Sequence, residues 1–177
     1  AFLVRGINVG GRHKVVMEEF CHELKELGMS NVSSYINSGN FFFDSSLMKV
    51  ELLLVLERFL NKTYPFIKVF SLFTLEDYQN EVASLPKWWE DDFYRKDVLL
   101  YTERLDKNEM RNVIESLELG DEIIHLGQLG IYWGKFDKSS YNQTAYHKKL
   151  LKAPFYPSIT IRNARTFSKI GHFLRMK

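Results

Sequence analysis

The sequence predicts an α+β protein made of two fused ferredoxin-like (βαββαβ) halves, with mainly antiparallel sheets and extra helices. The first observation is that strand-like and helix-periodic segments follow the order β-α-β-β-α-β-α twice, although the halves share no residue-level repeat. The second is that residues 86–96 fit neither periodicity and indicate a connector. We therefore expect an N-terminal ferredoxin-like half at 1–85 and a C-terminal α+β half at 97–177, which ends in a basic tail.

Apolar periodicity and turn residues place each element. In the first half, we expect strands at about 1–7, 32–36, from Phe41 and at 66–73, and helices at about 14–27, 47–62 and from Thr74 to just before Pro86. In the second half, we expect strands at 98–101, 122–126, 131–133 and 159–161, and helices from Asp106, at about 139–151 and at about 164–175. Residues 37–40 and 127–130 are the expected hairpin turns.

Residues 5–14, Arg-Gly-Ile-Asn-Val-Gly-Gly-Arg-His-Lys, place three glycines and three Lys or Arg side chains between the first strand and the first helix. No acidic residue precedes Glu18. Glycine lets backbone N–H groups approach a ligand, and a helix N-terminus favours an anion, so this composition predicts an anion pocket. The alternative is that the glycines only allow a tight turn, while Arg5 forms a salt bridge with an acid of the first half.

The ferredoxin-like plan brings a second segment to this loop. The first and second strands of such a half run parallel with the third between them, so the loop after the first strand and the 37–40 turn lie at one end of the sheet. We expect the two segments to converge into a binding site. Its predicted residues are Arg5, Gly6, Asn8, Gly10, Gly11, Asn37, Ser38, Gly39 and Asn40.

Charge is distributed unevenly along the chain. Residues 138–177 contain nine Lys or Arg and no Asp or Glu, whereas residues 1–137 hold the other 15 basic side chains and all 22 acidic ones. This basic tail indicates a negatively charged partner, either a small anionic ligand or nucleic acid, unless it packs against the acidic remainder of the chain. The tail residues expected to join the site are Lys149, Arg162, Asn163 and Lys169.

Several chemistries find no support in the sequence. Gly11 is followed by Arg-His rather than the Lys-Ser/Thr of a P-loop, and the glycine spacing does not match G-x-G-x-x-G. The five histidines show no metal-ligand spacing, and the single cysteine, Cys21, lies on an apolar helix face, so we expect no metal and no cofactor. Ser38 lacks a G-x-S-x-G context, which favours a role in the hairpin turn over a nucleophile.

The connector and the tail allow further interpretations. We interpret Trp88 and Trp89 as anchors between the halves, with a stacking platform for a base as the alternative. Asp91 and Asp92 are interpreted as solvated linker acids. The tail interleaves aromatic and basic side chains, as single-strand binders do, but no RNP-type aromatic motif marks the strands.

Several motifs of the chain occur together: Arg-Gly-Ile-Asn-Val-Gly-Gly at 5–11, Met17, Tyr-Ile-Asn-Ser-Gly-Asn at 35–40, Phe43, Lys149-Leu150, and Arg162-Asn163 with Thr166 and Lys169. With these motifs the chain resembles DUF1697, a bacterial family of domains of unknown function. The chain departs from the pattern at Ala164 and Arg165, where the family motif has Trp and Asn. The resemblance extends over essentially the whole chain and implies a compact cytosolic α+β protein, with no activity attached.

We therefore expect a cytoplasmic binding module for a small phosphate- or carboxylate-bearing ligand at the glycine-rich loop. Nucleic-acid binding through the tail is the first alternative. An enzyme acting on a phosphorylated substrate is the second, although no catalytic motif is recognisable and His13 is the one candidate for an acid–base residue within the loop. No apolar run approaches the roughly 18 residues of a membrane span, so we expect no membrane partner. The oligomeric state stays open.

Overall fold

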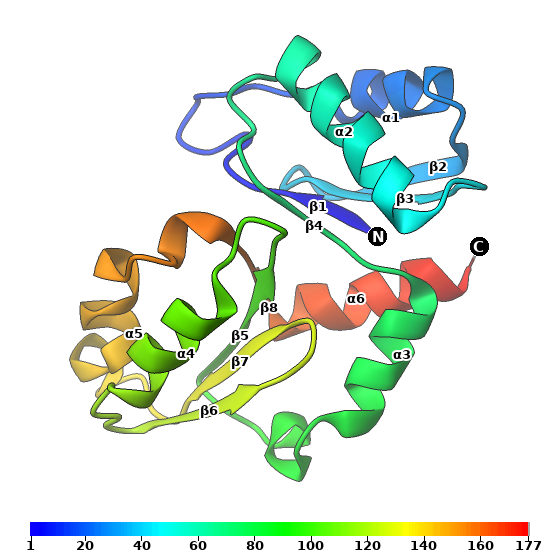
Figure 1. Cartoon of the computed structure of the whole chain (residues 1–177). Helices are drawn as coiled ribbons and strands as arrows, with labels where there is room; N and C mark the ends of the chain where they lie inside the picture. The colour runs from blue at the N-terminus through cyan, green and yellow to red at the C-terminus, as the bar shows by residue number, and fades with distance from the viewer. Residues whose placement is uncertain (177) are drawn as a thin grey trace.

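The computed structural model describes residues 1–176 and contains two four-stranded antiparallel sheets (Figure 1). Each sheet belongs to one half, and its strand order, β2-β3-β1-β4 or β6-β7-β5-β8, is that of a ferredoxin-like unit. The third strand of each half lies between the first and second, as the order of elements in the sequence predicts. The structure therefore confirms the α+β class and both ferredoxin-like halves.

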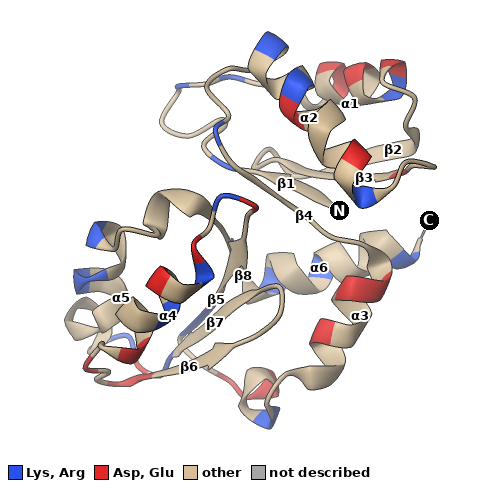
Figure 2. Cartoon of the chain, viewed as in Figure 1, with Lys and Arg blue, Asp and Glu red and all other residues tan. Residues whose placement is uncertain are grey.

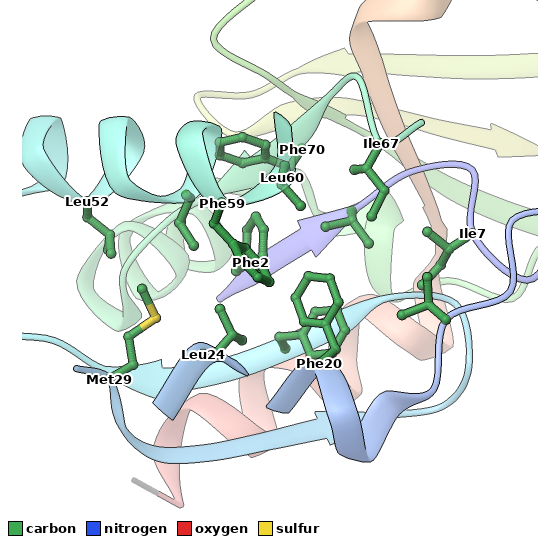
Figure 3. Close-up of a cluster of buried hydrophobic side chains, with 14 residues drawn as sticks. Phe2, Ile7, Phe20, Leu24, Met29, Leu52, Phe59, Leu60, Ile67 and Phe70 are labelled. Carbon is green, nitrogen blue, oxygen red and sulfur yellow. The ribbon is translucent and has the colours of Figure 1, made fainter. Parts of the chain in front are cut away.

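The first half supplies the sheet that is nearest to the predicted site. Its elements are β1 (Phe2–Val4), α1 (Met17–Glu26), β2 (Ser30–Tyr35), β3 (Asn40–Asp44), α2 (Lys49–Thr63), β4 (Phe70–Leu72) and the appended helix α3 (Leu75–Ser84). Helices α1 and α2 cover the outer face of this sheet. Figure 3 shows the apolar cluster between them, in which Phe2 of β1 is surrounded by side chains of both helices and of β4.

The second half repeats the plan with shorter and more irregular helices. Its elements are the 3₁₀ turn η1 (Lys87–Glu90), β5 (Arg95–Tyr101), α4 (Lys107–Glu115), β6 (Glu122–Leu126), β7 (Gly130–Lys135), α5 (Ala145–Lys148), β8 (Ile159–Asn163) and the final helix α6 (Ala164–Arg175). Three further 3₁₀ turns, at Tyr141–Gln143, Leu150–Lys152 and Tyr156–Ser158, lie around α5.

The two halves pack through their appended helices. Helices α3 and α6 lie between the two sheets, and α3 contacts α6 (Figure 1). The apolar cluster at this interface includes Leu3 of β1, Val98 of β5, Tyr78 of α3 and Phe167 of α6. Because burial of apolar surface is the main favourable term in folding, this shared core joins the halves into one body.

Several predicted elements differ in extent from the structure, including the first strand, which was expected at about 1–7 and covers Phe2–Val4, and the strand expected at 98–101, which begins at Arg95. Helix α1 begins at Met17 rather than near residue 14, because the Asn8 side chain binds the backbone of Val15 and holds it outside the helix. The strand expected at 66–73 is regular only over Phe70–Leu72. The helix expected at 139–151 is divided into short turns, because Thr144 adopts an extended conformation and starts a new helix at Ala145.

Charge does not follow the division into halves, because 10 of the 22 acidic residues lie in residues 1–85 and 12 in residues 86–137. Acidic residues occur on α1, α2 and α3 and also on α4, whereas the acid-free segment forms α5, β8 and α6 (Figure 2). No helix within residues 1–176 has the length and hydropathy of a membrane span.

Candidate anion-binding site

The glycine-rich loop forms a small hairpin that projects from the first half. The Arg12 N–H donates to the Val9 carbonyl at 3.1 Å, and Gly10 and Gly11 between them have φ values of 58° and 74°. Two positive φ values in succession are typical of a type I′ turn, which glycine adopts without strain. Gly10 and Gly11 therefore form the tip of this hairpin, within the loop that the sequence analysis places between the first strand and the first helix.

Asn8 connects the loop to the β2–β3 hairpin. Its Nδ2 donates to the carbonyls of Val15 and Asn37, at 3.0 Å each, and its Oδ1 accepts the Val15 N–H at 2.8 Å. The same Asn8 has a φ of 54°, a left-handed conformation that Asn tolerates better than most residues. These contacts confirm the predicted convergence of the loop with the 37–40 turn, and they also fix the chain that enters α1.

A shallow hollow lies where the glycine-rich loop, the start of α1 and the 37–40 turn meet. It is lined by Asn8, Gly11, Lys14, residues 15–18 and Asn37. Residues 15–17 supply its apolar lining, and Asn8, Lys14, Glu18 and Asn37 supply its polar side chains. Lys14 is the basic residue of this lining and Glu18 is the acidic one.

The start of α1 faces this hollow without a side-chain cap. Val16 occupies the N-cap position and offers no hydrogen-bonding side chain. Among residues 1–176, the other α-helices all receive a side-chain oxygen at their first turn or N-cap, from Glu51, Thr74, Asp106, Thr144 and Asn163. The first N–H groups of α1 are thus left for solvent or a ligand, although Glu18 and Glu19 in its first turn partly offset the helix dipole.

Arg5 points away from the hollow and toward the second half. Its Nη1 donates to the carbonyls of Tyr156 and Ile159, the latter at 2.7 Å, and its guanidinium lies 4.3 Å from the centre of the Tyr156 ring. The salt bridge with a first-half acid, which was the alternative for this residue, does not occur. Arg5 instead ties the glycine-rich loop to the segment that leads into β8.

Arg162 makes the reciprocal contact from β8 to the first half. Its Nη2 donates to the carbonyls of Val4, Ser38 and Gly39 at 2.9 to 3.1 Å, and its Nε donates to Asn40 Oδ1 at 2.6 Å. Burial lowers the pKa of Arg162 to about 10, because no carboxylate accompanies the guanidinium into the protein. Arg162 thus fixes the 37–40 turn rather than presenting its charge to a ligand.

The 37–40 turn supplies most of the acceptors for this arginine, and its own hydrogen bonds hold them in place. Asn40 is fully buried, and its Nδ2 donates to the Tyr35 carbonyl at 2.9 Å and to Ser38 Oγ at 3.1 Å. Gly39 has a φ of 79° and accepts the Val4 N–H through its carbonyl at 2.9 Å. Asn37 alone of the four turn residues lines the hollow.

The other predicted residues are scattered. Lys149 ends α5 and is exposed, and α5 packs on the outer face of the second sheet. Asn163 caps α6 by accepting the Thr166 N–H at 2.8 Å, and Lys169 is exposed on α6, which packs on the inner face. Gly6 is exposed, and its carbonyl lies 3.1 Å from Nδ1 of His13 in the loop. The tail therefore does not form one face with the hollow.

A buried charge network in the second half has no counterpart in the predictions. Lys135 is fully buried, and its Nζ donates to Asp97 Oδ2 at 2.6 Å, while Arg95 Nε donates to the same oxygen at 2.7 Å. Burial lowers the pKa of Lys135 to about 8, and its ammonium lies 3.6 Å from the centre of the Tyr146 ring. A lysine at the end of an otherwise apolar strand was the available signal. Because the ammonium is inaccessible, the network is structural.

The described residues offer little for metal chemistry. No group of three or more His, Cys, Asp or Glu side chains within residues 1–176 could hold a metal ion. His13 stacks on Phe66 with ring centres 4.6 Å apart and contacts a backbone carbonyl, so its ring has a structural neighbour on one face.

Comparisons with known proteins place the chain without assigning an activity. The family described as "Protein of unknown function (DUF1697)" matches residues 1–132. A solved structure, that of the conserved bacterial protein SP0830 from Streptococcus pneumoniae, is 57% identical and superposes with a TM-score of 0.96, covering 98% of this chain and 96% of that one. No curated protein matches the chain. The family match ends before the basic tail, whereas the solved relative includes it.

Proposed function

The chain belongs to DUF1697, a family of unknown function. From the geometry around its glycine-rich loop, we propose that it is a binding module for a small anionic ligand. The ligand carries a phosphate or carboxylate group and binds in the hollow between the glycine-rich loop, the start of α1 and the β2–β3 hairpin. With a single cysteine and no internal disulfide, the chain suits a reducing compartment, which we propose is the bacterial cytoplasm.

One observation carries the proposal. Among the α-helices of residues 1–176, α1 is the one whose first turn and N-cap receive no side-chain oxygen, and it opens onto a hollow that contains Lys14. Free N–H groups and the positive end of the helix dipole favour an anion at this position. The N–H groups of Gly10 and Gly11 also make no hydrogen bond within the described chain, so they add donors at the tip of the neighbouring turn.

The surrounding contacts make the site preorganised. Asn8 binds both the 37–40 turn and the residue before the α1 cap, and Arg162 binds that turn from the second half. A site whose walls are already fixed loses less conformational entropy when a ligand binds. Lys14 supplies the charge, the α1 amides supply directed donors, and Asn37 and Gly11 border the ligand.

The basic tail supports nucleic-acid binding less well. Its cationic residues lie on both faces of the second sheet, on α5 and on α6, and Arg162 is buried. A duplex or single strand needs a continuous basic surface to track its phosphates. Tight binding that weakens steeply with salt, with no response to small anions, would favour this alternative.

Thermal-shift measurements test the proposal. The wild type is titrated with inorganic phosphate, acetate, sugar phosphates and nucleotides, beside two single-charge variants of the same helical region. Lys14→Ala removes the cation of the hollow, and Lys25→Ala removes an exposed cation from the other end of α1. We expect at least one anion to raise Tm by several degrees in the wild type and in Lys25→Ala, and to raise it less in Lys14→Ala.

Arg5→Ala is unsuitable as the test, because Arg5 holds the two halves together and its loss would lower stability directly. If none of the anions stabilises the wild type, or if both lysine variants respond equally, the hollow is not an anion site.

A further inference from the structure

A second hollow lies beside the inner face of the second sheet. It is about 340 Å³ in volume and lies between α3, the η1 turn and the first turn of α6. Its walls include three aromatic side chains, Tyr78, Trp89 and Phe167, one from each element. This volume is at the lower end of the range for small-molecule sites, which are mostly apolar with a few polar groups.

Trp89 is held in place from outside the hollow. Its ring packs edge-on against Tyr132 with centres 4.9 Å apart, and Lys96 Nζ donates to its carbonyl at 2.6 Å and lies 5.4 Å from its ring centre. The side chain nevertheless stays partly exposed. A rigid, accessible aromatic ring offers a stacking surface at low entropic cost.

The other two rings are fixed in a similar way. Tyr78 donates its hydroxyl hydrogen to the Phe167 carbonyl at 3.3 Å, and the two rings lie 5.0 Å apart. Gly171 allows this packing, since a Cβ atom there would lie 2.3 Å from the Tyr78 ring. The aromatic walls therefore keep their geometry without a ligand.

The rim carries exposed polar groups that form no hydrogen bond or ion pair within the described residues. Lys87, Glu90 and Ser168 line the hollow and are exposed, and none of the three side chains forms a hydrogen bond or ion pair within residues 1–176. A cation, an anion and a hydroxyl together present donors and acceptors around an aromatic wall. That combination suits a flat ring that has both donors and acceptors on its edge.

We propose that this hollow binds a small planar heteroaromatic molecule with the hydrogen-bonding edge of a nucleobase. The ring stacks on Trp89, and its edge reaches Glu90, Lys87 and Ser168. This site is separate from the glycine-rich loop and does not depend on the function proposed for it. It also gives Trp89 a role in addition to its packing against Tyr132.

Adenosine is the probe, with ribose as the control that lacks the ring. Binding is followed by tryptophan fluorescence, with excitation at the long-wavelength edge of the tryptophan absorption band. For every variant it is also measured by equilibrium dialysis. We expect saturable binding of adenosine but not ribose, retained in Trp88→Leu and weakened about tenfold or more in Trp89→Leu. Trp88→Leu is matched because it removes the adjacent indole, which does not line the hollow.

Two exposed rim variants keep the proposal testable if Trp89→Leu does not fold. Glu90→Gln and Lys87→Met should each weaken adenosine binding several-fold while leaving Tm nearly unchanged. The proposal is overturned if adenosine does not bind the wild type, if Trp89→Leu binds it equally, or if both rim variants are unaffected. Binding that is lost in Lys14→Ala instead would place the ring at the glycine-rich loop and would also overturn it.

Discussion

Arg162 on β8 donates its Nε hydrogen to Asn40 Oδ1 on β3 across 2.6 Å, although 122 positions separate the two residues in the chain. The remaining donors of the guanidinium go to backbone carbonyls, three of them in the first half. No carboxylate takes part, so carbonyl dipoles and one amide oxygen replace the water that a buried cation loses. This arrangement makes Arg162 the polar centre of the contact between the halves.

Replacing Arg162 with lysine should destabilise the protein by about 3 kcal/mol, because an ammonium cannot reach the fan of acceptors and leaves buried carbonyls unpaired. Urea unfolding gives the free energy of unfolding. Arg165→Lys makes the same substitution at an exposed position of α6 and should change it by less than about 0.5 kcal/mol. Equal effects of the two variants would show that the Arg162 contacts contribute little.

Gly39→Ala should lower the free energy of unfolding by more than the unfavourable backbone conformation of a non-glycine residue would alone. At Gly39 the φ is 79° and a Cβ atom would lie 2.4 Å from Val4 Cγ2, so β1 or the turn must shift. Gly28 has a φ of 89° with nothing within 4 Å of the added atom, which makes Gly28→Ala the matched control. We expect a loss of about 1 kcal/mol for Gly28→Ala and about 3 kcal/mol for Gly39→Ala by urea unfolding. Similar losses would contradict the predicted clash.

The sequence was sufficient to predict the fold because the signals for it are local. Alternating periodicities and turn residues gave the order of elements, and that order specifies the strand arrangement of a ferredoxin-like half. The convergence of the glycine-rich loop with the 37–40 turn followed from the same topology. Asn8 now provides its physical basis through hydrogen bonds to both segments.

The contacts that the sequence analysis did not predict are made by side chains whose partners are far away in the sequence. Arg5 was predicted to contact the ligand because it lies in the glycine-rich loop, and Arg162 because it belongs to the acid-free tail. Most of their acceptors are backbone carbonyls more than 120 residues away, and no spacing rule reveals such partners. The broken helix around α5 has a similar origin, because Glu122 of β6 binds the N–H groups of Ala145 and Tyr146.

Glu122→Gln should weaken this junction between β6, β7 and α5. One carboxylate oxygen accepts the Trp133 Nε1 hydrogen and the Tyr146 N–H at 2.9 Å each, and the other accepts the Ala145 N–H at 2.5 Å. The amide of Gln places an NH₂ group against one of these donors, so we expect a loss of about 2 to 3 kcal/mol in urea unfolding. Glu118→Gln, at an exposed position, should be neutral. A neutral Glu122→Gln would show that the charge is not needed to start α5.

The buried ammonium of Lys135 should make stability depend on pH in the alkaline range. Burial lowers its pKa to about 8 in the folded state, against 10.5 for the free side chain, despite the attraction of Asp97. Between these values the unfolded chain binds the extra proton, so the free energy of unfolding rises with pH by up to about 1.4 kcal/mol per unit. Lys135→Met removes this titration and leaves Arg95 beside Asp97. The stability of the wild type relative to Lys135→Met should therefore increase by about 3 kcal/mol from pH 7 to pH 10.5 in urea unfolding, whereas a constant or falling difference would show that Lys135 does not titrate in this range.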